Sequence, residues 1–253
     1  MPWHHFAHYF IRSPITFSDM GKLQYSIVAF LDVLGFSAMV KHDSEAEEEK
    51  FLPRIISIFE KLADTPKPAQ MSIRMFSDSI TITAPLSPEN ILRTIEVCAE
   101  LQILCLKQKI LLRGGISFGK HFSNESLIFS DALVKAYFIE SKIARFPRIV
   151  VDPNALNYAW HDQHTNNELK EGFRKLVVID RDGANFVHYL NSLGEVKVPL
   201  QELLEEKIPQ TETVMEKLRW LYDYHNHYAL AEDKPLLQIE TLVNGFSQLT
   251  EIP

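Results

Sequence analysis

The order of strand-like and helix-like patterns along the first half of the chain restricts the fold most strongly. Short runs rich in β-branched and aromatic residues alternate with longer stretches in which apolar residues recur every three or four positions. The order is strand, helix, strand, strand, helix, strand, which is the βαββαβ arrangement of ferredoxin-like sheets. The strands are expected at 25–31, 71–76, 79–83 and 111–119, and the helices at 44–63 and 91–109.

Local signals refine the two helices and the last strand. The helix over 44–63 has an acidic first turn, and Pro53 is expected to split or kink it. Ser87 followed by Pro88 is a typical helix start. The adjacent pair Gly114-Gly115 predicts a place where the backbone of the last strand approaches another segment closely.

Two aspartates stand at strand ends that this fold brings together. Asp32 ends the first strand, and Asp78 opens the third strand after a hairpin. In the ferredoxin-like order the first strand lies antiparallel beside the third, about 4.8 Å away. We therefore expect the two carboxylates to meet, at a spacing suited to two metal ions about 3.5–4 Å apart.

A pair of carboxylates in apolar strands predicts a cation site. Without a cation the two like charges would repel each other and stay poorly solvated. Phosphoryl transfer suits such a site, because metal ions neutralise triphosphate oxygens and help to activate the attacking hydroxyl group. The turn Leu34-Gly35-Phe36 is expected to offer backbone N–H groups to the same phosphates.

The rest of the chain predicts an elaboration of the same domain. A serine-capped helix, three short strands and an amphipathic helix rich in aromatic residues follow the core, and Asp182-Gly183 predicts a hairpin turn. These elements are expected at 130–142, 148–151, 175–179, 185–190 and 211–230. We divide the chain into an N-terminal arm (1–22), a core (23–153) and a C-terminal elaboration (154–253).

Composition excludes several classes of protein. The chain has 253 residues, of which 46% are hydrophobic, which is enough for a full core. A net charge of -7 without a long basic run argues against nucleic acid as a partner. No apolar stretch approaches about 18 residues and no secretory signal opens the chain, so we expect a soluble cytoplasmic protein without a membrane partner. Cys98 and Cys105, roughly 10 Å apart on one helix, are expected to stay unpaired.

The segments around the two aspartates resemble class III nucleotidyl cyclases. The first metal motif of that family is similar to Phe30-Leu31-Asp32-Val33-Leu34-Gly35-Phe36, and its hairpin Gly-Asp corresponds to Ser77-Asp78. The likeness is closer to the Pycsar pyrimidine cyclases of bacterial antiphage defence, through the segments LDVLGF, FSDSI, RGGISFG, ALVKAYFIE and ARFPRIVVDP. It runs from Tyr25 to about Pro153, and more weakly through Trp220-Leu221 and 224–226.

The resemblance implies a homodimer that converts a pyrimidine nucleoside triphosphate, UTP in preference to CTP, into the 3',5'-cyclic monophosphate and pyrophosphate. Asp32 and Asp78 would carry two Mn²⁺ or Mg²⁺ ions per site, with the Val33 carbonyl as an added ligand. The product would be a second messenger for a separate effector protein with a cyclic-nucleotide-binding domain. A purine nucleotide cyclase and a catalytically silent nucleotide-binding or interaction module of the same fold are the alternatives.

The sequence departs from the family on the helix over 130–142. Val134 and Phe138 stand where ordinary class III cyclases place an Asn and an Arg that stabilise the transition state. Arg113 and Lys120 are candidates for phosphate contact, with a surface-facing strand charge as the alternative for each. Arg74 stands four residues before Asp78, where it would either bond a pyrimidine carbonyl or pack over the sheet edge.

Other polar residues are interpreted as structural. One group on and after the same helix is assigned to helix and dimer structure, with an ion pair between Glu140 and an arginine. The paired histidines are not expected to form metal sites, because no cysteine or second acid pair completes the first pair and the second pair would face different sides of a helix. The first group is Tyr137, Glu140, Arg145 and Arg148, and the histidines are His161 with His164 and His225 with His227.

Overall fold

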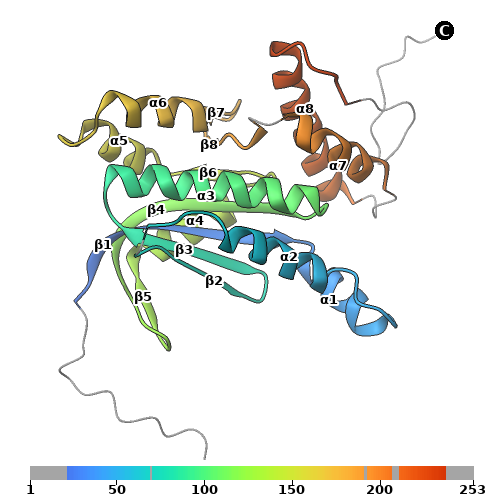
Figure 1. The fold of residues 1–253 in the computed structure, drawn as a ribbon, viewed down its shortest axis with the longest axis horizontal. Coiled ribbons are helices and arrows are strands. Elements are labelled where there is room, and N and C mark those ends of the chain that lie inside the picture. Colours follow the sequence, from blue (N-terminus) through green and yellow to red (C-terminus); the bar gives the residue numbers. More distant parts are fainter. Residues whose placement is uncertain (1–21, 69, 191–192, 207–210, 238–253) are drawn as a thin grey trace, which may run out of the picture.

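A computed structural model describes residues 22–68, 70–190, 193–206 and 211–237 (Figure 1). The predicted N-terminal arm, apart from Lys22, lies outside the described residues, as do the last sixteen residues of the predicted C-terminal elaboration, 238–253.

The core contains the predicted βαββαβ order, with one helix more than expected. Its strands are β1 (Gln24–Leu34), β2 (Ser72–Phe76), β3 (Ser79–Pro85) and β4 (Leu111–Ser123). They lie side by side in the order β2-β3-β1-β4, and each neighbouring pair is antiparallel. The α+β fold class is therefore confirmed, and so is the placement of the first strand beside the third.

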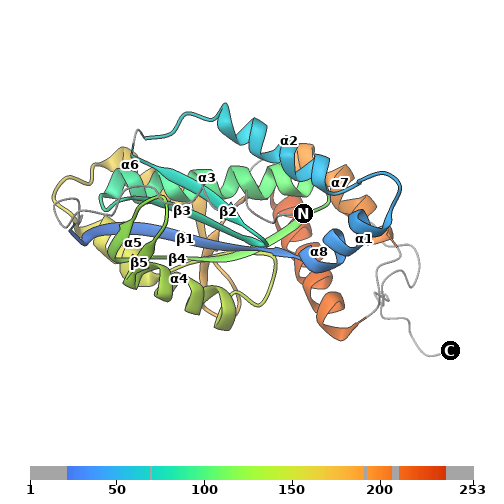
Figure 2. The same cartoon turned by 90° about the horizontal axis from the view of Figure 1, so that it is seen from below.

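The two faces of β1 pack against different helices. The side chains of Ile27, Ala29 and Leu31 are fully buried in the main core. That core also receives α2 (Leu52–Ala63) and α3 (Pro88–Lys107). The alternate residue Val28 contacts Ala132 and Ala136 of α4 (Asp131–Lys142) on the other face. Figure 2 shows α4 on one side of β1 and β4, and α2 and α3 on the other. This period of two leaves Asp32 on the α4 face of the sheet.

The single helix predicted over 44–63 is two helices. The first, α1, spans Phe36–Glu45 directly after β1, and α2 follows after a loop that holds the acidic run. Pro53 lies in the first turn of α2, where a residue without an N–H group is tolerated. Asp43 stabilises this start, because its carboxylate accepts hydrogen bonds from the backbone N–H groups of residues 50–52. The proline therefore begins a helix instead of bending one.

The second core helix agrees with the sequence. The side chain of Ser87 accepts a hydrogen bond from the Asn90 backbone N–H at 3.1 Å, so the predicted cap is present. Cys98 and Cys105 are both buried in α3 and unpaired, as expected. Burial raises the pKa of each thiol far above its usual range.

The elements after the core extend the same sheet. Strand β6 (Ile149–Val151) pairs in parallel with β4, then β8 (Asn185–Val187) pairs with β6, and β7 (Val177–Ile179) forms the edge. The hairpin with Asp182-Gly183 at its turn is confirmed, although its strands are shorter than predicted. Four further elements were not predicted: β5 (Ile128–Ser130), α5 (Pro153–His161), α6 (Asn167–Leu176) and α7 (Leu193–Glu205).

The last described helix, α8 (Glu212–Ala231), is attached to the sheet through a buried arginine. The Arg148 side chain is fully buried and pairs with Asp180 and Asp182 at the start of the β7–β8 turn. Trp220 of α8 donates its indole N–H to Asp180 at 2.7 Å. Trp220 also stacks on Phe146, with ring centroids 5.7 Å apart. The Asp180 carboxylate thus connects Arg148, next to β6, with Trp220 of α8.

Replacing Arg148 by methionine should lower the free energy of unfolding by about 3 kcal/mol, because it leaves the Asp180 carboxylate without its cation in a largely buried position. Urea unfolding followed by circular dichroism measures the change. Arg145→Met is the matched control, since Arg145 is exposed three residues earlier. Equal stability of the two variants would contradict this role of the Arg148 pair.

Candidate active site

The register of β1 and β3 brings the two predicted aspartates together. Asp32 lies opposite Ser79, the first residue of β3. One position further along, Val33 faces Asp78, and the Val33 backbone N–H donates a hydrogen bond of 2.9 Å to the Asp78 carbonyl oxygen. The two strand ends therefore lie side by side, as predicted, with Val33 opposite Asp78; the meeting of the two carboxylates stays a prediction.

The hairpin that carries Asp78 has a strained backbone. Ser77 has φ +56°, and the loop between β2 and β3 contains only Ser77 and Asp78. Two-residue hairpin loops need positive φ, for which glycine has no steric penalty. Ser77 stands where the class III cyclases that the sequence resembles have the glycine of their Gly-Asp pair. The turn that carries Asp78 therefore has a non-glycine residue at positive φ.

Arg113 sits beside the first aspartate. It lies opposite Asp32 across β1 and β4, and its Nε–H donates to Asp32 Oδ2 at 3.0 Å. Glu140 Oε1 of α4 lies 2.6 Å from the same Nε atom. That oxygen nevertheless receives no hydrogen bond from the described residues, since Nε has one hydrogen and Asp32 accepts it. A single guanidinium nitrogen therefore lies between two carboxylates.

Glu140 is a third carboxylate of the site, and the sequence analysis missed it. Its ion pair with an arginine was expected, but the partner is Arg113 and the Glu140 side chain faces the aspartates. Only 3% of Glu140 is exposed. Burial raises its pKa, Arg113 opposes that shift, and the nearby charges of Asp32 and Asp78 add to it. Each of the two aspartates thus lies close enough to Glu140 to act on its charge.

The glycine pair of β4 allows two close approaches, of α4 at Gly115 and of β1 at Gly114. A side-chain Cβ at Gly115 would lie 2.3 Å from the carbonyl oxygen of Ala136 and 2.7 Å from Cβ of Ile139, both on α4. A Cβ at Gly114 would lie 2.7 Å from the carbonyl oxygen of Phe30 on β1. The predicted close approach is confirmed, and it places Glu140 within reach of Arg113.

The turn after β1 has the form expected of an anion site. Leu34 ends β1, Gly35 adopts φ +80°, and Phe36 begins α1. Gly35 caps α1 without a side chain, so no side-chain hydrogen bond satisfies the first N–H groups of the helix. Free N–H groups at a helix start attract phosphate oxygens.

Arg74 lies on the same sheet face as Asp32, within a groove. It pairs with Thr81 across β2 and β3, and its Nη1 donates to the Asn124 carbonyl oxygen at 2.8 Å. The groove has a volume of about 470 Å³. Its walls include Arg74, Phe30, Ser79 and Phe76, a residue that is 86% exposed.

The structure does not bring Lys120 to the carboxylates. It lies opposite Tyr25 at the far end of β1, seven positions along β4 from Arg113. At about 3.4 Å per residue this is a separation of roughly 24 Å. Within one chain Lys120 therefore cannot contact a phosphate held between the aspartates, and its exposed side chain fits the alternative interpretation of a surface charge.

The donors at the site suit a hard divalent cation. Carboxylate oxygens are the ligands that Mg²⁺ and Mn²⁺ prefer. Among the described residues no three His, Cys, Asp or Glu side chains converge as a group that could hold a metal ion. Asp32 is bonded to Arg113 in this structure, so it would have to give up that bond to hold a cation. His161 ends α5 and His164 lies after it, so the two do not share a helix, while His225 is buried and His227 exposed on opposite sides of α8.

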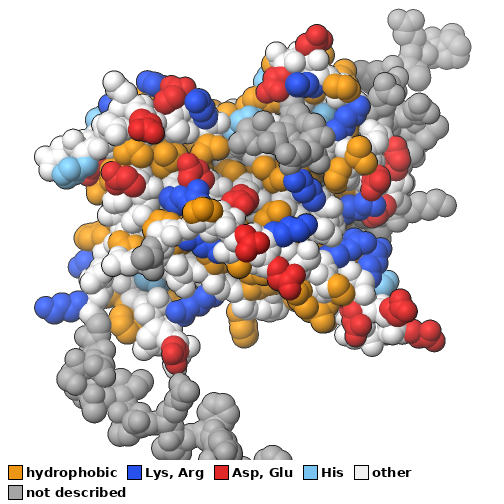
Figure 3. Space-filling view, viewed as in Figure 1, with side chains coloured by type: hydrophobic (Ala, Val, Ile, Leu, Met, Phe, Trp, Pro, Cys, Tyr) orange, Lys and Arg blue, Asp and Glu red, His pale blue; other side chains and the backbone are white. Residues whose placement is uncertain are grey.

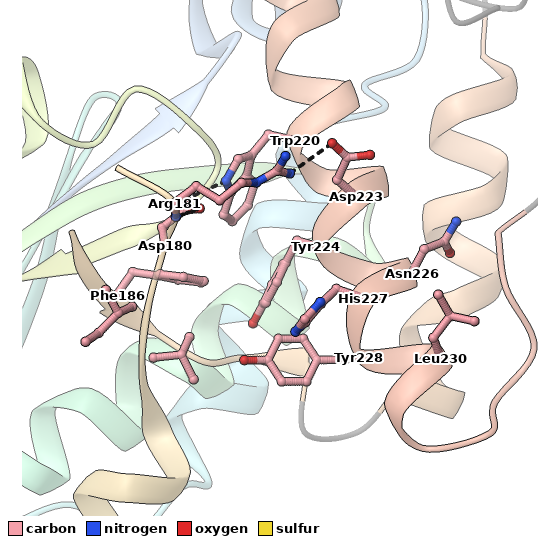
Figure 4. A pocket seen from close by; sticks show the side chains of 12 residues that line it. Asp180, Arg181, Phe186, Trp220, Asp223, Tyr224, Asn226, His227, Tyr228 and Leu230 are labelled. Carbon is pink, nitrogen blue, oxygen red and sulfur yellow. Dashed lines mark hydrogen bonds and ion pairs between the residues drawn. The ribbon is translucent and has the colours of Figure 1, made fainter. Parts of the chain in front are cut away.

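A separate cavity lies away from these carboxylates, between α8 and the β7–β8 hairpin (Figure 4). It has a volume of about 580 Å³. Several polar groups that line it pair with each other: Arg181 with Asp223 at 3.0 Å, and Trp220 with Asp180. Trp220 and Tyr224 also stack, with centroids 5.1 Å apart. These contacts hold α8 against the sheet.

Charged side chains of both signs share the face that Figure 3 shows, where acidic and basic residues are interspersed. The absence of nucleic acid as a partner stays a prediction. No helix within the described ranges is long and apolar enough to cross a membrane.

Comparison with known proteins gives likenesses of structure alone. No protein family matches the sequence, and no curated protein matches it either. The structure is similar to the monomeric guanylyl cyclase domain of the RhoGC fusion protein from the aquatic fungus Blastocladiella emersonii, at 11% identity and a TM-score of 0.44. The matched part covers 66% of this chain and 95% of that one.

Two other solved structures are similar at the same level. The catalytic core of a rhodopsin-guanylyl cyclase with converted specificity, in complex with ATPαS, has 13% identity and a TM-score of 0.45, covering 66% and 96% of the two chains. A class III adenylyl cyclase-like ATP-binding protein from Pseudomonas aeruginosa has 10% identity and a TM-score of 0.40, covering 59% and 40%. At these values the similarity carries no weight for substrate or activity.

Gly115→Ala should lower the free energy of unfolding by about 2 kcal/mol or more, because a Cβ at this position meets backbone on α4 and forces the helix away from β4. Thermal unfolding measures the loss. Gly119→Ala is the matched control, since the nearest atom to its Cβ is the end of the exposed Asp131 side chain, which can turn away, and not backbone. If Gly115→Ala were as stable as Gly119→Ala, the glycine would not set the distance between α4 and β4.

Proposed function

We propose that this protein is a nucleotidyl cyclase that converts UTP, or CTP, into its 3',5'-cyclic monophosphate and pyrophosphate. One observation carries the proposal: the antiparallel pairing of β1 with β3 joins Asp32 and Asp78 at a sheet position where Arg113 and Glu140 supply further charges. Carboxylates for divalent cations beside a cation for phosphate are what in-line transfer onto a ribose hydroxyl requires.

Each residue then has a role in binding or positioning. Asp32 and Asp78, with the Val33 carbonyl, would hold two Mn²⁺ or Mg²⁺ ions, which when bound neutralise triphosphate oxygens and favour ionisation of the ribose 3'-hydroxyl. Arg113 keeps Glu140 as its partner when Asp32 binds a cation. Its Nη nitrogens hydrogen-bond no described residue, so they remain available to phosphate oxygens.

The remaining contacts to the nucleotide come from the turn and the groove. The N–H groups at Gly35 and Phe36 bind phosphate, as their position at the start of α1 favours. Arg74 lines the groove on the same sheet face, where one of its nitrogens is free of the Asn124 carbonyl and can donate to a pyrimidine carbonyl. The preference for UTP rests on the family resemblance.

A homodimer is part of this proposal, and α4 supports it. Val134, Tyr137 and Phe138 are exposed on one helix, at 66%, 55% and 57%. Tyr137 also contacts Phe30 edge-on, with centroids 5.5 Å apart. Large apolar side chains that gather on a surface mark an interface. Val134 and Phe138 stand at the positions where ordinary class III cyclases have their Asn and Arg, and here their exposed apolar side chains favour a dimer interface instead.

A second candidate, a catalytically silent nucleotide-binding module, is favoured by one observation. Arg113 bonds directly to Asp32, and α4 offers no Asn or Arg at positions 134 and 138. Such a module would bind triphosphates without releasing pyrophosphate. A purine cyclase differs only in the base it accepts.

The product of the pyrimidine cyclase would act on a separate effector in antiphage defence.

Asp32→Asn and Asp78→Asn should each lower pyrophosphate release from UTP with Mn²⁺ on the order of 100-fold or more, because each removes a charged metal ligand. Asp223→Asn, which alters a partly exposed aspartate of α8, is the control and should keep wild-type activity. The assay supplies each of the four ribonucleoside triphosphates separately and identifies products by mass.

Three outcomes would contradict the proposal in different ways. Full activity of either aspartate variant would rule out the metal assignment. Cyclisation of ATP or GTP alone would make the protein a purine cyclase. Binding of triphosphate without any pyrophosphate release would leave the silent module.

Phe138→Glu should convert the dimer into a monomer, because it places a charge within the proposed apolar interface. Light scattering coupled to size-exclusion chromatography measures the mass. Ile179→Glu is the matched control, since Ile179 is a 72% exposed apolar residue on the edge strand β7. A monomeric wild-type protein whose specific activity does not depend on concentration would overturn the dimer.

A further inference from the structure

The C-terminal helix α8 carries a lysine toward the carboxylates of the core. Lys217 stands three and four positions before Trp220 and Leu221, so the three residues share one face of the helix. Trp220 and Leu221 are both buried against the core. Because they turn inward, Lys217 also turns inward, and its side chain is half-buried.

Contacts of Trp220 fix the orientation of α8 against the sheet. Trp220 donates to Asp180 at 2.7 Å and stacks on Tyr224 (Figure 4). It also stacks on Phe146. Asp180 in turn pairs with the buried Arg148. Figure 2 shows α8 close to the end of β1 that carries Asp32. The helix therefore presents Lys217 to the site from a rigid support.

The electrostatic neighbours of Lys217 belong to the candidate active site. Burial and the positive charge of Arg113 lower its pKa, while the negative charge of Asp32 opposes that shift. Lys217 forms no hydrogen bond or ion pair with any residue that the structure describes. Arg113, by contrast, already pairs with Asp32 and Glu140. Of these two neighbouring cations, Lys217 is the one left without a close anion.

A half-buried ammonium group without an anionic partner is costly, and such groups are common at functional sites. A cation held near another cation, Arg113, is suited to an anion with several charges. Phosphate oxygens are the anions that lysine side chains bind as point charges. The triphosphate of the proposed substrate is such an anion.

We propose that Lys217 binds the phosphates of the nucleoside triphosphate and supplies, from the C-terminal elaboration, a cation that α4 lacks at Val134 and Phe138. This inference rests on the proposed function, since it assigns a residue to the same site. It also gives the segment after residue 153 a direct part in substrate binding.

The test uses the full-length protein and two probes, inorganic tripolyphosphate with Mg²⁺ and UTP with Mn²⁺. Lys217→Met keeps the aliphatic stem and removes the charge. It should weaken tripolyphosphate binding in calorimetry, and lower kcat/KM for UTP, by roughly 10- to 100-fold, the loss expected for one charge-assisted hydrogen bond. Lys217→Arg should recover much of the binding. Lys175→Met, which removes an exposed lysine of α6, should change neither value.

A second measurement needs no variant and so does not depend on folding. Reductive methylation of the wild-type protein, followed by peptide mass spectrometry, should modify Lys217 more slowly when tripolyphosphate and Mg²⁺ are present. Lys175 provides the internal reference. Unchanged modification of Lys217, wild-type binding by Lys217→Met, or no binding of tripolyphosphate by the wild type would each overturn the assignment.

The failure of this inference can be told from the failure of the proposed function. Tripolyphosphate binding that depends on Lys217, without cyclisation of any nucleotide, would leave the phosphate site and remove the cyclase. Cyclisation that is equal in the wild type and Lys217→Met would leave the cyclase and remove Lys217 from its site.

Discussion

The pairing of β1 with both β3 and β4 is the constraint on which the rest of the structure depends. β1 is the central strand of the core, and its register sets Asp32 opposite Ser79 on one side and Arg113 on the other. A shift by one residue would turn Asp32 into the apolar core and Leu31 toward α4. Because Ile27, Ala29 and Leu31 are fully buried, the hydrophobic pattern itself holds the polar site in register.

Close packing of α4 on β4 adds the second layer of the site. Gly115 allows the backbone of α4 to approach β4, because a Cβ there would lie 2.3 Å from the Ala136 carbonyl oxygen. That approach buries Glu140 beside Arg113, so the site combines three carboxylates with a guanidinium group. Burial raises the pKa of Glu140, and the negative charges of Asp32 and Asp78 add to that shift. A bound cation would relieve this crowding of negative charge.

The C-terminal elements support the core in a different way. β8 and β7 continue the sheet beyond β6, and Arg148, Asp180 and Trp220 connect that extension to α8. These contacts hold Lys217 on the inner face of the helix. The helix is therefore part of the surroundings of the site, although it lies more than a hundred residues after Arg113 in the chain.

Sequence alone determined the order of the core strands, the adjacency of the strand ends that carry Asp32 and Asp78, the cap at Ser87 and the close approach at Gly114-Gly115. Each of these depends on local signals: hydrophobic period, turn residues and capping residues act over a few positions. It did not reveal that residues 44–63 form parts of two helices, since Pro53 is equally compatible with a kink and with a helix start.

Only the tertiary structure decided which charges share the site. Glu140 and Lys217 come from helices whose rotation is set by packing against the sheet, and no local pattern encodes that rotation. The same packing separated Lys120 from the site, because its distance along β4 matters only once the register of β1 is known. Local sequence patterns thus predicted the strand ends that carry the two aspartates. Only the packing of α4 and α8 showed that Glu140 and Lys217 lie near them.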